Sequence, residues 1–289
     1  MSISSKIKSK VEAKLNESLK TDVSVGGGCI ADSKIITTQS GKTYFLKTYA
    51  GSPGMFLNEA NGLIELAKPD AIRVPKVILA DEDFLLLEYI PSGNKGSDFF
   101  TQFGRNYAKM HRYTSRQFGF YEDNYIGSTP QLNLATQQES TNWPIFYYNK
   151  RIVAQLKFAE QNGNATNELV QLVTKLEGCI EDILNTSSEQ PTLLHGDLWG
   201  GNYMCDSNGE AVLIDPAVYF GHREADLAMT KMFGGFTSEF YQAYQNEYPL
   251  ITGWEYREGI YLLYHYMNHL NLFGNSYYGE CIRLLKKYM

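Results

Sequence analysis

Two neighbouring stretches decide how this chain is interpreted: HGDLWGGN at residues 195–202 and VLIDP at residues 212–216. The first is a glycine-rich loop after an apolar run near 192–194. The second is an apolar run that ends in an aspartate, which predicts a strand near 211–214. Together they place Asp197, Asn202 and Asp215 in two loops that each follow a strand.

These three polar side chains match the needs of phosphoryl transfer. One carboxylate accepts or orients the proton of an attacking hydroxyl, while an oxygen ligand and a second carboxylate hold Mg²⁺ on the phosphates. Asp197 suits the first role, and Asn202 with Asp215 suits the second. An Asp- and Asn-rich turn between two strands would explain any one of these residues, but not the ordered set.

The first 90 residues indicate a small β-rich lobe. Apolar residues four apart predict a helix over about residues 2–20, and a second helical pattern covers 54–67. Five strands are predicted around these helices, at 23–25, 30–38, 43–48, 74–79 and 84–89.

This lobe carries candidate phosphate-binding residues. Gly26, Gly27 and Gly28 lie between two predicted strands, where glycines let backbone N–H groups approach phosphates. Lys47 lies in a predicted strand and Glu59 on the next helix, in the order expected for a lysine that a glutamate holds toward the phosphates. The alternatives are a plain hairpin turn, a solvated lysine and a surface glutamate.

From residue 91 onward the sequence is mainly helical. Pro91–Asn94 has loop composition, and Ser97 is predicted to cap a helix that runs to Thr114. Further helices are predicted over 142–162, 165–185, 223–233, 236–247, 254–272 and 276–288. The sequence therefore predicts a nucleotide-binding lobe at 1–90 and a helical catalytic and substrate lobe at 91–289.

Composition excludes several broad classes. The 289 residues are 43% hydrophobic and 20% charged, an ordinary globular balance. The formal net charge of −6 argues against a general nucleic-acid binder. No apolar run reaches about 18 residues, so we expect no membrane span, and the N-terminus lacks the apolar segment of a secretory signal. Four dispersed cysteines without C-x-x-C predict reduced thiols in a cytoplasmic protein, and no zinc site.

The motifs also carry a family resemblance. D-x-x-x-x-N followed by D resembles the catalytic and metal-binding loops of protein kinases, and HGD with IDP resembles the aminoglycoside phosphotransferase and choline kinase branch. HGDLWGGN with IDPAVYFGHREADLAM (214–229) is similar to the fructosamine kinase, or ketosamine-3-kinase, family. Further similar segments are GFYEDNYIGSTPQLN (119–133), FYYNKRIVAQ (146–155) and FGGF (233–236).

The resemblance implies an α+β, bilobal protein-kinase-like fold, with a small N-terminal antiparallel sheet lobe and a larger helical C-terminal lobe. It implies ATP and Mg²⁺ as cofactors and the 3-hydroxyl of a ketosamine, such as fructosamine or ribulosamine, as acceptor in a deglycation or repair reaction. The adenine would then bind the backbone of a hinge at Glu88, Tyr89 and Ile90, and Asp226 would anchor the catalytic loop.

The acceptor site is less well defined by the sequence. Trp199, two residues from Asp197, could wall it, and Trp143, Tyr219 and His222 are further candidates. The expected partner is a small ketosamine or glycated amine, with no nucleic acid and no membrane, and the chain would be a monomer or a homodimer. Cys29, directly after the glycines, could be redox-sensitive or an inert side chain.

Two other functions remain open from the sequence. One is a kinase that acts on another amino compound, of the aminoglycoside or choline type. The other is a pseudokinase that binds nucleotide and serves as an interaction module, although such proteins usually lose Lys47, Asp197, Asn202 or Asp215, and all four are present.

Overall fold

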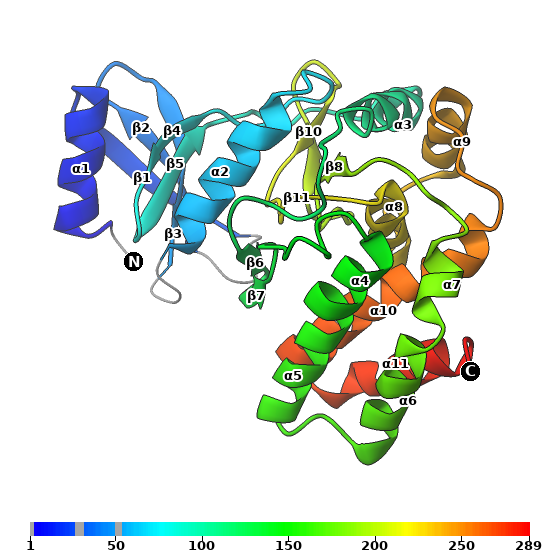
Figure 1. Ribbon diagram of the computed structural model, residues 1–289. Coiled ribbons are helices and arrows are strands. Elements are labelled where there is room, and N and C mark those ends of the chain that lie inside the picture. The colour runs from blue at the N-terminus through cyan, green and yellow to red at the C-terminus, as the bar shows by residue number, and fades with distance from the viewer. Residues whose placement is uncertain (1–2, 27–31, 50–53) are drawn as a thin grey trace.

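The computed structural model describes residues 3–26, 32–49 and 54–289, and it has the expected α+β composition (Figure 1). A five-stranded antiparallel sheet lies at one side of the molecule, in the strand order β1-β2-β3-β5-β4. Its strands are β1 (Leu19–Val25), β2 (Asp32–Thr38), β3 (Thr43–Thr48), β4 (Val77–Ala80) and β5 (Phe84–Glu88).

Two helices cover this sheet, α1 (Ser5–Leu15) and α2 (Met55–Ala67). The interior strand β5 is apolar at every position from 84 to 87, because alternate side chains face different helices. Phe84 and Leu86 pack in a cluster with Val11 of α1, whereas Leu85 and Leu87 pack in a cluster with α2. Strand β5 is therefore buried on both faces, and α2 is held in a defined position over it.

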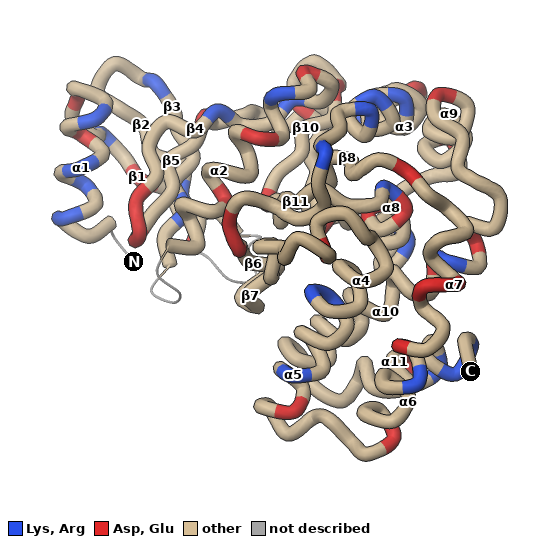
Figure 2. Tube along the Cα trace, in the orientation of Figure 1, with Lys and Arg blue, Asp and Glu red and all other residues tan. Residues whose placement is uncertain are grey.

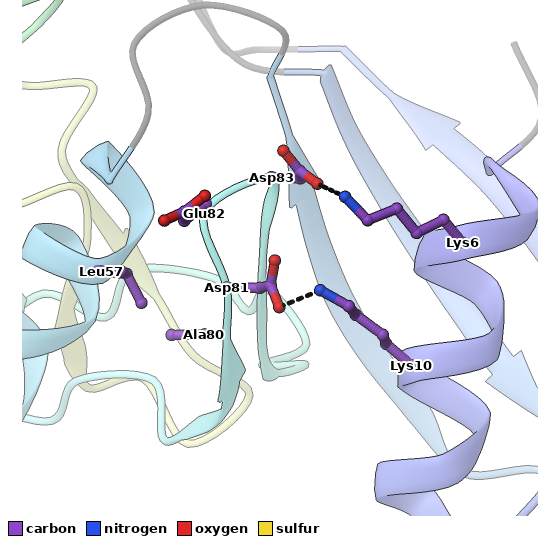
Figure 3. Close-up of a pocket in the computed structure, with 7 residues that line it drawn as sticks. All are labelled: Lys6, Lys10, Leu57, Ala80, Asp81, Glu82 and Asp83. Atoms are coloured by element: carbon purple, nitrogen blue, oxygen red, sulfur yellow. Dashed lines mark hydrogen bonds and ion pairs between the residues drawn. The ribbon is translucent and has the colours of Figure 1, made fainter.

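Helix α1 is also fastened to the turn between β4 and β5 by charge. Lys6 pairs with Asp83 at 2.6 Å and Lys10 with Asp81 at 2.5 Å, along the edge of a surface pocket (Figure 3). These pairs are exposed to solvent, so their contribution to stability is small.

The rest of the chain is mainly helical and forms the larger part of the molecule (Figure 1). Its long helices are α3 (Phe99–Met110), α6 (Asn167–Glu177), α8 (Arg223–Met232), α9 (Ser238–Glu247), α10 (Trp254–Phe273) and α11 (Tyr278–Lys286). Shorter helical segments are α4 (Trp143–Tyr147), the π-helix η1 (Tyr148–Val153), α5 (Ala154–Gln161), α7 (Ile180–Leu184) and the 3-10 helix η2 (Asn275–Tyr277).

Three antiparallel strand pairs lie between the sheet and these helices: β6 (Asn124–Ile126) with β7 (Thr129–Gln131), β8 (Thr192–Leu194) with β11 (Tyr219–Gly221), and β9 (Tyr203–Cys205) with β10 (Ala211–Leu213). The loop 195–202 lies between β8 and β9, and Asp215 follows β10. The two loops singled out in the sequence are thus both carried by these short strands.

Several local predictions need correction. The first helix ends at Leu15, where Asn16 adopts the left-handed conformation (φ 51°), so Leu19 begins a strand instead of completing a helical face. Ser97 does not cap α3, which begins at Phe99 after Asp98 without a side-chain cap bond. The predicted helix 142–162 contains the π-helical turn η1, and 165–185 is broken between Glu177 and Ile180.

Figure 2 shows acidic and basic residues interspersed along both parts of the chain. Among the helices of the described ranges, none combines the length and the apolar character needed to cross a bilayer. The division at residue 90 stays a prediction, although the five-stranded sheet does end at Glu88.

Candidate active site

The structure brings Lys47 together with two carboxylates from distant parts of the chain. Its Nζ lies 2.7 and 2.8 Å from the carboxylate oxygens of Glu59 on α2, and 2.9 Å from Oδ1 of Asp215. Burial disfavours the cation, but the two carboxylates outweigh it and raise the pKa of the Lys47 ammonium above its usual value. Lys47 therefore stays charged, and it links the sheet to the loop after β10.

Close packing sets the distance between α2 and that loop. Glu59 and Gly62 are three residues apart and so share one face of α2. A Cβ on Gly62 would lie 3.3 Å from Cγ2 of Val218 and 3.4 Å from Cγ of Pro216. Because Pro216 follows Asp215 directly, the absence of a side chain at Gly62 lets both carboxylates reach Lys47.

The β6–β7 hairpin holds the same segment from its other side. Asn124 donates to the carbonyl of Val218 at 2.7 Å, and Gln131 donates to the carbonyl of Ala217 at 2.9 Å. Asn61 of α2 also donates to Glu122 at 3.0 Å, just before β6. The hairpin therefore connects α2 to residues 217–218, which follow Asp215 and Pro216 in the sequence.

The three oxygen-bearing residues of the two loops lie side by side. The side-chain nitrogen of Asn202 donates to the carbonyl oxygen of Asp197 at 2.7 Å and to its Oδ2 at 3.1 Å. With the amide oriented this way, Oδ1 of Asn202 is left as an acceptor for a cation. Asp215 adopts the left-handed conformation (φ 55°), its Oδ1 pairs with Lys47, and its side chain is 46% exposed, which leaves Oδ2 as a second carboxylate oxygen for a cation.

Asp197 itself is only partly accessible to solvent. Burial raises the pKa of its carboxyl well above the ordinary value; the hydrogen bond from Asn202 opposes this, and the nearby Asp215 and Asp226 add to it. A carboxylate whose pKa is raised is a better proton acceptor, which suits the role of general base.

Asp226 anchors the loop that carries Asp197, as the resemblance implies. Its carboxylate accepts the backbone N–H groups of His195 at 2.7 Å and Gly196 at 2.8 Å, and the Tyr107 hydroxyl at 2.6 Å. Gly196 has φ +82°, and a Cβ there would lie 1.9 Å from the carbonyl oxygen of Ala217. Only glycine fits at this position of the loop.

His195 acts as a scaffold. Its Nε2 lies 2.9 Å from the carbonyl of Ile214, and its Nδ1 accepts from the backbone of Asp197 at 3.3 Å. Burial lowers the pKa of this imidazole, so it is neutral and ties the two functional loops together.

The predicted hinge residues lie at the end of β5. The Glu88 carboxylate pairs with Arg73 at 2.7 Å, and Arg73 also pairs with Asp206 of the β9–β10 turn at 2.7 Å. The backbone N–H of Glu88 is used by the carbonyl of Lys76, whereas no described residue accepts a hydrogen bond from the backbone N–H of Ile90. Ile90 and the Glu88 carbonyl thus remain the backbone candidates for adenine, together with neighbouring Tyr89.

The glycine loop is only partly described. Gly26 follows β1, and a side chain there would meet nothing within 4 Å. Gly27, Gly28 and Cys29 lie outside the described residues.

Three of the four acceptor-site candidates belong to the core and are withdrawn as substrate contacts. Trp143 is 5% exposed and donates to the hydroxyl of Tyr261 at 3.1 Å. Tyr219 is buried in β11, and His222 caps α8 while contacting Ser187. Trp199 is the exception, because it is partly exposed and meets Phe233 edge to face at 5.9 Å.

A Mg²⁺ ion fits these residues. Among the described residues, no three His, Cys, Asp or Glu side chains form a ready-made metal cage. Mg²⁺, however, usually takes one or two protein oxygens and completes its octahedron with phosphate oxygens and waters. Oδ1 of Asn202 and Oδ2 of Asp215 are two such oxygens beside a buried lysine.

Sequence reasoning missed Arg73, Asp206 and Gly62. No motif distinguishes them, because each acts through a contact between segments that are remote in the sequence. The one available signal was Gly62 itself, a helix-disfavouring residue within a helical pattern, which usually has a packing or functional reason.

Comparisons with known proteins give matches over nearly the whole chain. The family model described as fructosamine kinase matches residues 1–289. The chain is 40% identical over 278 residues to the chloroplastic protein-ribulosamine 3-kinase of Arabidopsis thaliana, covering 92% of this chain and 82% of that protein. A crystal structure of a candidate fructosamine-3-kinase from Thermobifida fusca superposes with a TM-score of 0.88 at 30% identity, covering 98% of each chain. A spectinomycin phosphotransferase in complex with ADP and spectinomycin shares the fold, with a TM-score of 0.57 at 17% identity, covering 100% of this chain and 94% of that one.

Proposed function

This chain belongs to the fructosamine kinase family, and on that premise we propose that it transfers the γ-phosphoryl group of ATP to the 3-hydroxyl of a ketosamine. The observation that carries the proposal is the contact of Lys47 with both Glu59 and Asp215, at 2.7 and 2.9 Å. Lys47 belongs to the sheet and Asp215 to a loop of the helical part. Their contact therefore defines one place where a nucleoside triphosphate can bind.

Each residue then has a role at that place. Lys47, oriented by Glu59, neutralises charge on the nucleotide phosphates, and the glycines at 26–28 would donate backbone N–H groups to them, as the sequence predicts. Asn202 and Asp215 would hold Mg²⁺, which would neutralise charge on the phosphates. The backbone at Glu88, Tyr89 and Ile90 receives the adenine.

Asp197 orients the acceptor hydroxyl and takes up its proton as the phosphoryl group moves. The transition state of such transfers is loose, so positioning and charge stabilisation supply most of the rate enhancement. Phosphorylation at this hydroxyl would destabilise the sugar–amine adduct, which fits a role in deglycation of small or protein-bound amines.

The test is a phosphate-transfer assay on fructosamine, ribulosamine and erythrulosamine conjugates, with an aminoglycoside and choline as competing acceptors. We expect turnover on at least one ketosamine and none on the competitors. Asp197→Ala is the matched inactive control: it should still bind Mg-ATP in a thermal-shift assay while kcat falls about 10²- to 10⁴-fold. Mg-ATP binding without turnover on any acceptor would instead indicate a pseudokinase.

The metal ligands are tested separately by titration with Mg²⁺. Asp215→Asn should raise the Mg²⁺ concentration needed for half-maximal activity and lower turnover, because the amide is a weaker ligand than the carboxylate. A wild-type titration curve for this variant would contradict the assignment of Asp215.

A further inference from the structure

An aromatic strip leads away from the catalytic loop, formed by Trp199, Phe233, His269, Phe273 and Tyr277. The ring centroids of Trp199 and Phe233 are 5.9 Å apart, those of Phe233 and His269 are 5.0 Å apart, and those of His269 and Phe273 are 5.4 Å apart. Tyr277 closes the strip, 5.1 Å from His269. The strip thus connects the catalytic loop, the end of α8 and the end of α10.

This strip is accessible at both of its phenylalanines. Phe233 is 46% exposed and Phe273 is 58% exposed, while the other three rings, of Trp199, His269 and Tyr277, are partly buried. Single exposed hydrophobic residues are common on protein surfaces, but here the two exposed rings are joined through His269 into one row that begins at the catalytic loop.

The loop that carries Phe233 is held rigidly. Gly235 has φ +92°, and a Cβ there would lie 2.9 Å from Cα of Gly200, so the loop packs directly on the catalytic loop. The carbonyl of Gly235 accepts from the hydroxyl of Tyr203 at 2.7 Å, and Phe236 packs against the buried rings of Phe103 and Phe240. Phe233 is therefore presented to solvent by a fixed loop, which lowers the cost of ordering it on binding.

His269 gives the strip one hydrogen-bond acceptor. Its Nδ1 lies 2.8 Å from the carbonyl of His265, four residues earlier on α10, so Nδ1 carries the hydrogen. Burial lowers the pKa of the imidazole, which keeps the ring neutral. Its Nε2 is then an acceptor at the centre of a row of ring faces, an environment that suits an ammonium with an apolar substituent.

We infer that this aromatic strip binds the amine side of the acceptor, namely the protonated secondary amine of a ketosamine and the alkyl chain beyond it, as in a glycated lysine of a peptide. The reacting sugar hydroxyl must reach Asp197, and the strip starts at Trp199, two residues further along the chain. Phe273 is three ring contacts along the strip from Trp199, so the outer part of the strip is available for whatever the nitrogen carries.

The inference rests on the proposed function, and its experiment separates the two. The probes are two adducts of the ketose that the wild type phosphorylates best, one of methylamine and one of Nα-acetyl-lysine methylamide. Phe233→Ala, Phe273→Ala and the double variant are compared with the wild type by kcat/KM on each adduct. Tyr256→Ala is the matched control, because Tyr256 is a 49% exposed aromatic residue at the opposite end of α10.

Each single variant should lower kcat/KM for the lysine adduct about 2- to 5-fold, mainly through KM, and the double variant about 5- to 25-fold. The methylamine adduct should change less than 2-fold with Phe273→Ala, and Tyr256→Ala should change neither value. An equal effect of Phe273→Ala on both adducts, or no effect of any variant on the lysine adduct, overturns the proposed role of the strip while leaving the kinase assignment intact. No turnover of fructosyl, ribulosyl or erythrulosyl adducts by the wild type would refute the proposed function as well.

Discussion

Replacement of Gly62 by valine tests how tightly α2 is set against the loop of Asp215. Gly62 is one turn beyond Glu59, and a Cβ at this position would be 3.3 Å from Val218 and 3.4 Å from Pro216. Carbon atoms prefer separations of about 3.5–4.0 Å. Gly62→Ala is therefore already a tight contact, which a shift of a few tenths of an ångström relieves, and the higher helix propensity of alanine offsets the strain.

Valine adds two further carbons about 1.5 Å beyond that Cβ, and in a helix its side chain has one strongly preferred rotamer. The overlap of this side chain with Val218 and Pro216 is then relieved only if α2 moves away from them by about 1 Å. Glu59 moves with α2, while Asp215 stays with Pro216, so the distances of 2.7 and 2.9 Å to Lys47 cannot both be kept. Misplacement by about 1 Å costs on the order of 10²-fold in turnover, equivalent to about 2.7 kcal/mol in the barrier.

The assay is steady-state phosphorylation of the best ketosamine acceptor, with the melting temperature measured on the same samples. Gly62→Val should lose about 10²-fold in kcat/KM, with a loss of about 1–3 kcal/mol in stability from overpacking. Gly62→Ala should stay within about 3-fold of the wild type. Gly279→Val controls for valine in a helix, since Gly279 on α11 has open space around it. A folded Gly62→Val enzyme with wild-type kinetics would refute the argument that this contact sets the Lys47 geometry.

Three further predictions concern buried groups. Asp226→Asn should lower the free energy of unfolding by about 1–3 kcal/mol for each backbone N–H that loses its acceptor, because His195 and Gly196 both donate to this carboxylate. The variant should also have a lower kcat. Urea unfolding and kinetics measure both effects, and an unchanged urea midpoint would contradict the anchoring role. Trp143→Ala should cost about 3–5 kcal/mol of stability with little change in the KM for the acceptor, because Trp143 is buried. Urea unfolding and kinetics on the folded enzyme measure the two quantities. A raised KM with unchanged stability would instead place Trp143 in the acceptor site. Stability should also fall as the pH drops from about 7.5 to 5.5. Burial lowers the pKa of all five histidines, so the unfolded chain takes up protons over this range that the folded chain does not. The five are His111, His195, His222, His265 and His269. Each histidine contributes at most about 1.4 kcal/mol over that range, and a urea midpoint independent of pH would show that the histidines titrate normally in the folded state.

Much of the fold follows from local patterns in the sequence. The helix over 54–67 and the strand over 43–48 match α2 and β3 closely, because each has a strong periodicity and clear boundaries. The strands β6, β7, β9 and β11 escaped prediction. Each is three residues long, too short to show a period, and exists only because a partner segment pairs with it.

The aromatic residues also show what local sequence patterns cannot predict. Tyr219 and Trp199 occur in motif segments and Trp143 lies just before one, and the sequence offers no means of telling a core ring from a cleft ring. The structure buries Trp143 and Tyr219 and leaves Trp199 beside the exposed Phe233. Burial depends on which elements pack around a residue, and that information is spread over the whole chain.

The sequence by itself determined the chemistry of this protein, since Asp197, Asn202 and Asp215 lie in two short loops whose spacing is a local property. Only the tertiary structure decided how α2 meets the loop of Asp215, how Arg73 joins β5 to the β9–β10 turn, and which rings form the aromatic strip. The physical reason is that each of these contacts joins segments far apart along the chain, so its geometry is set by close packing and by the pairing of buried charges.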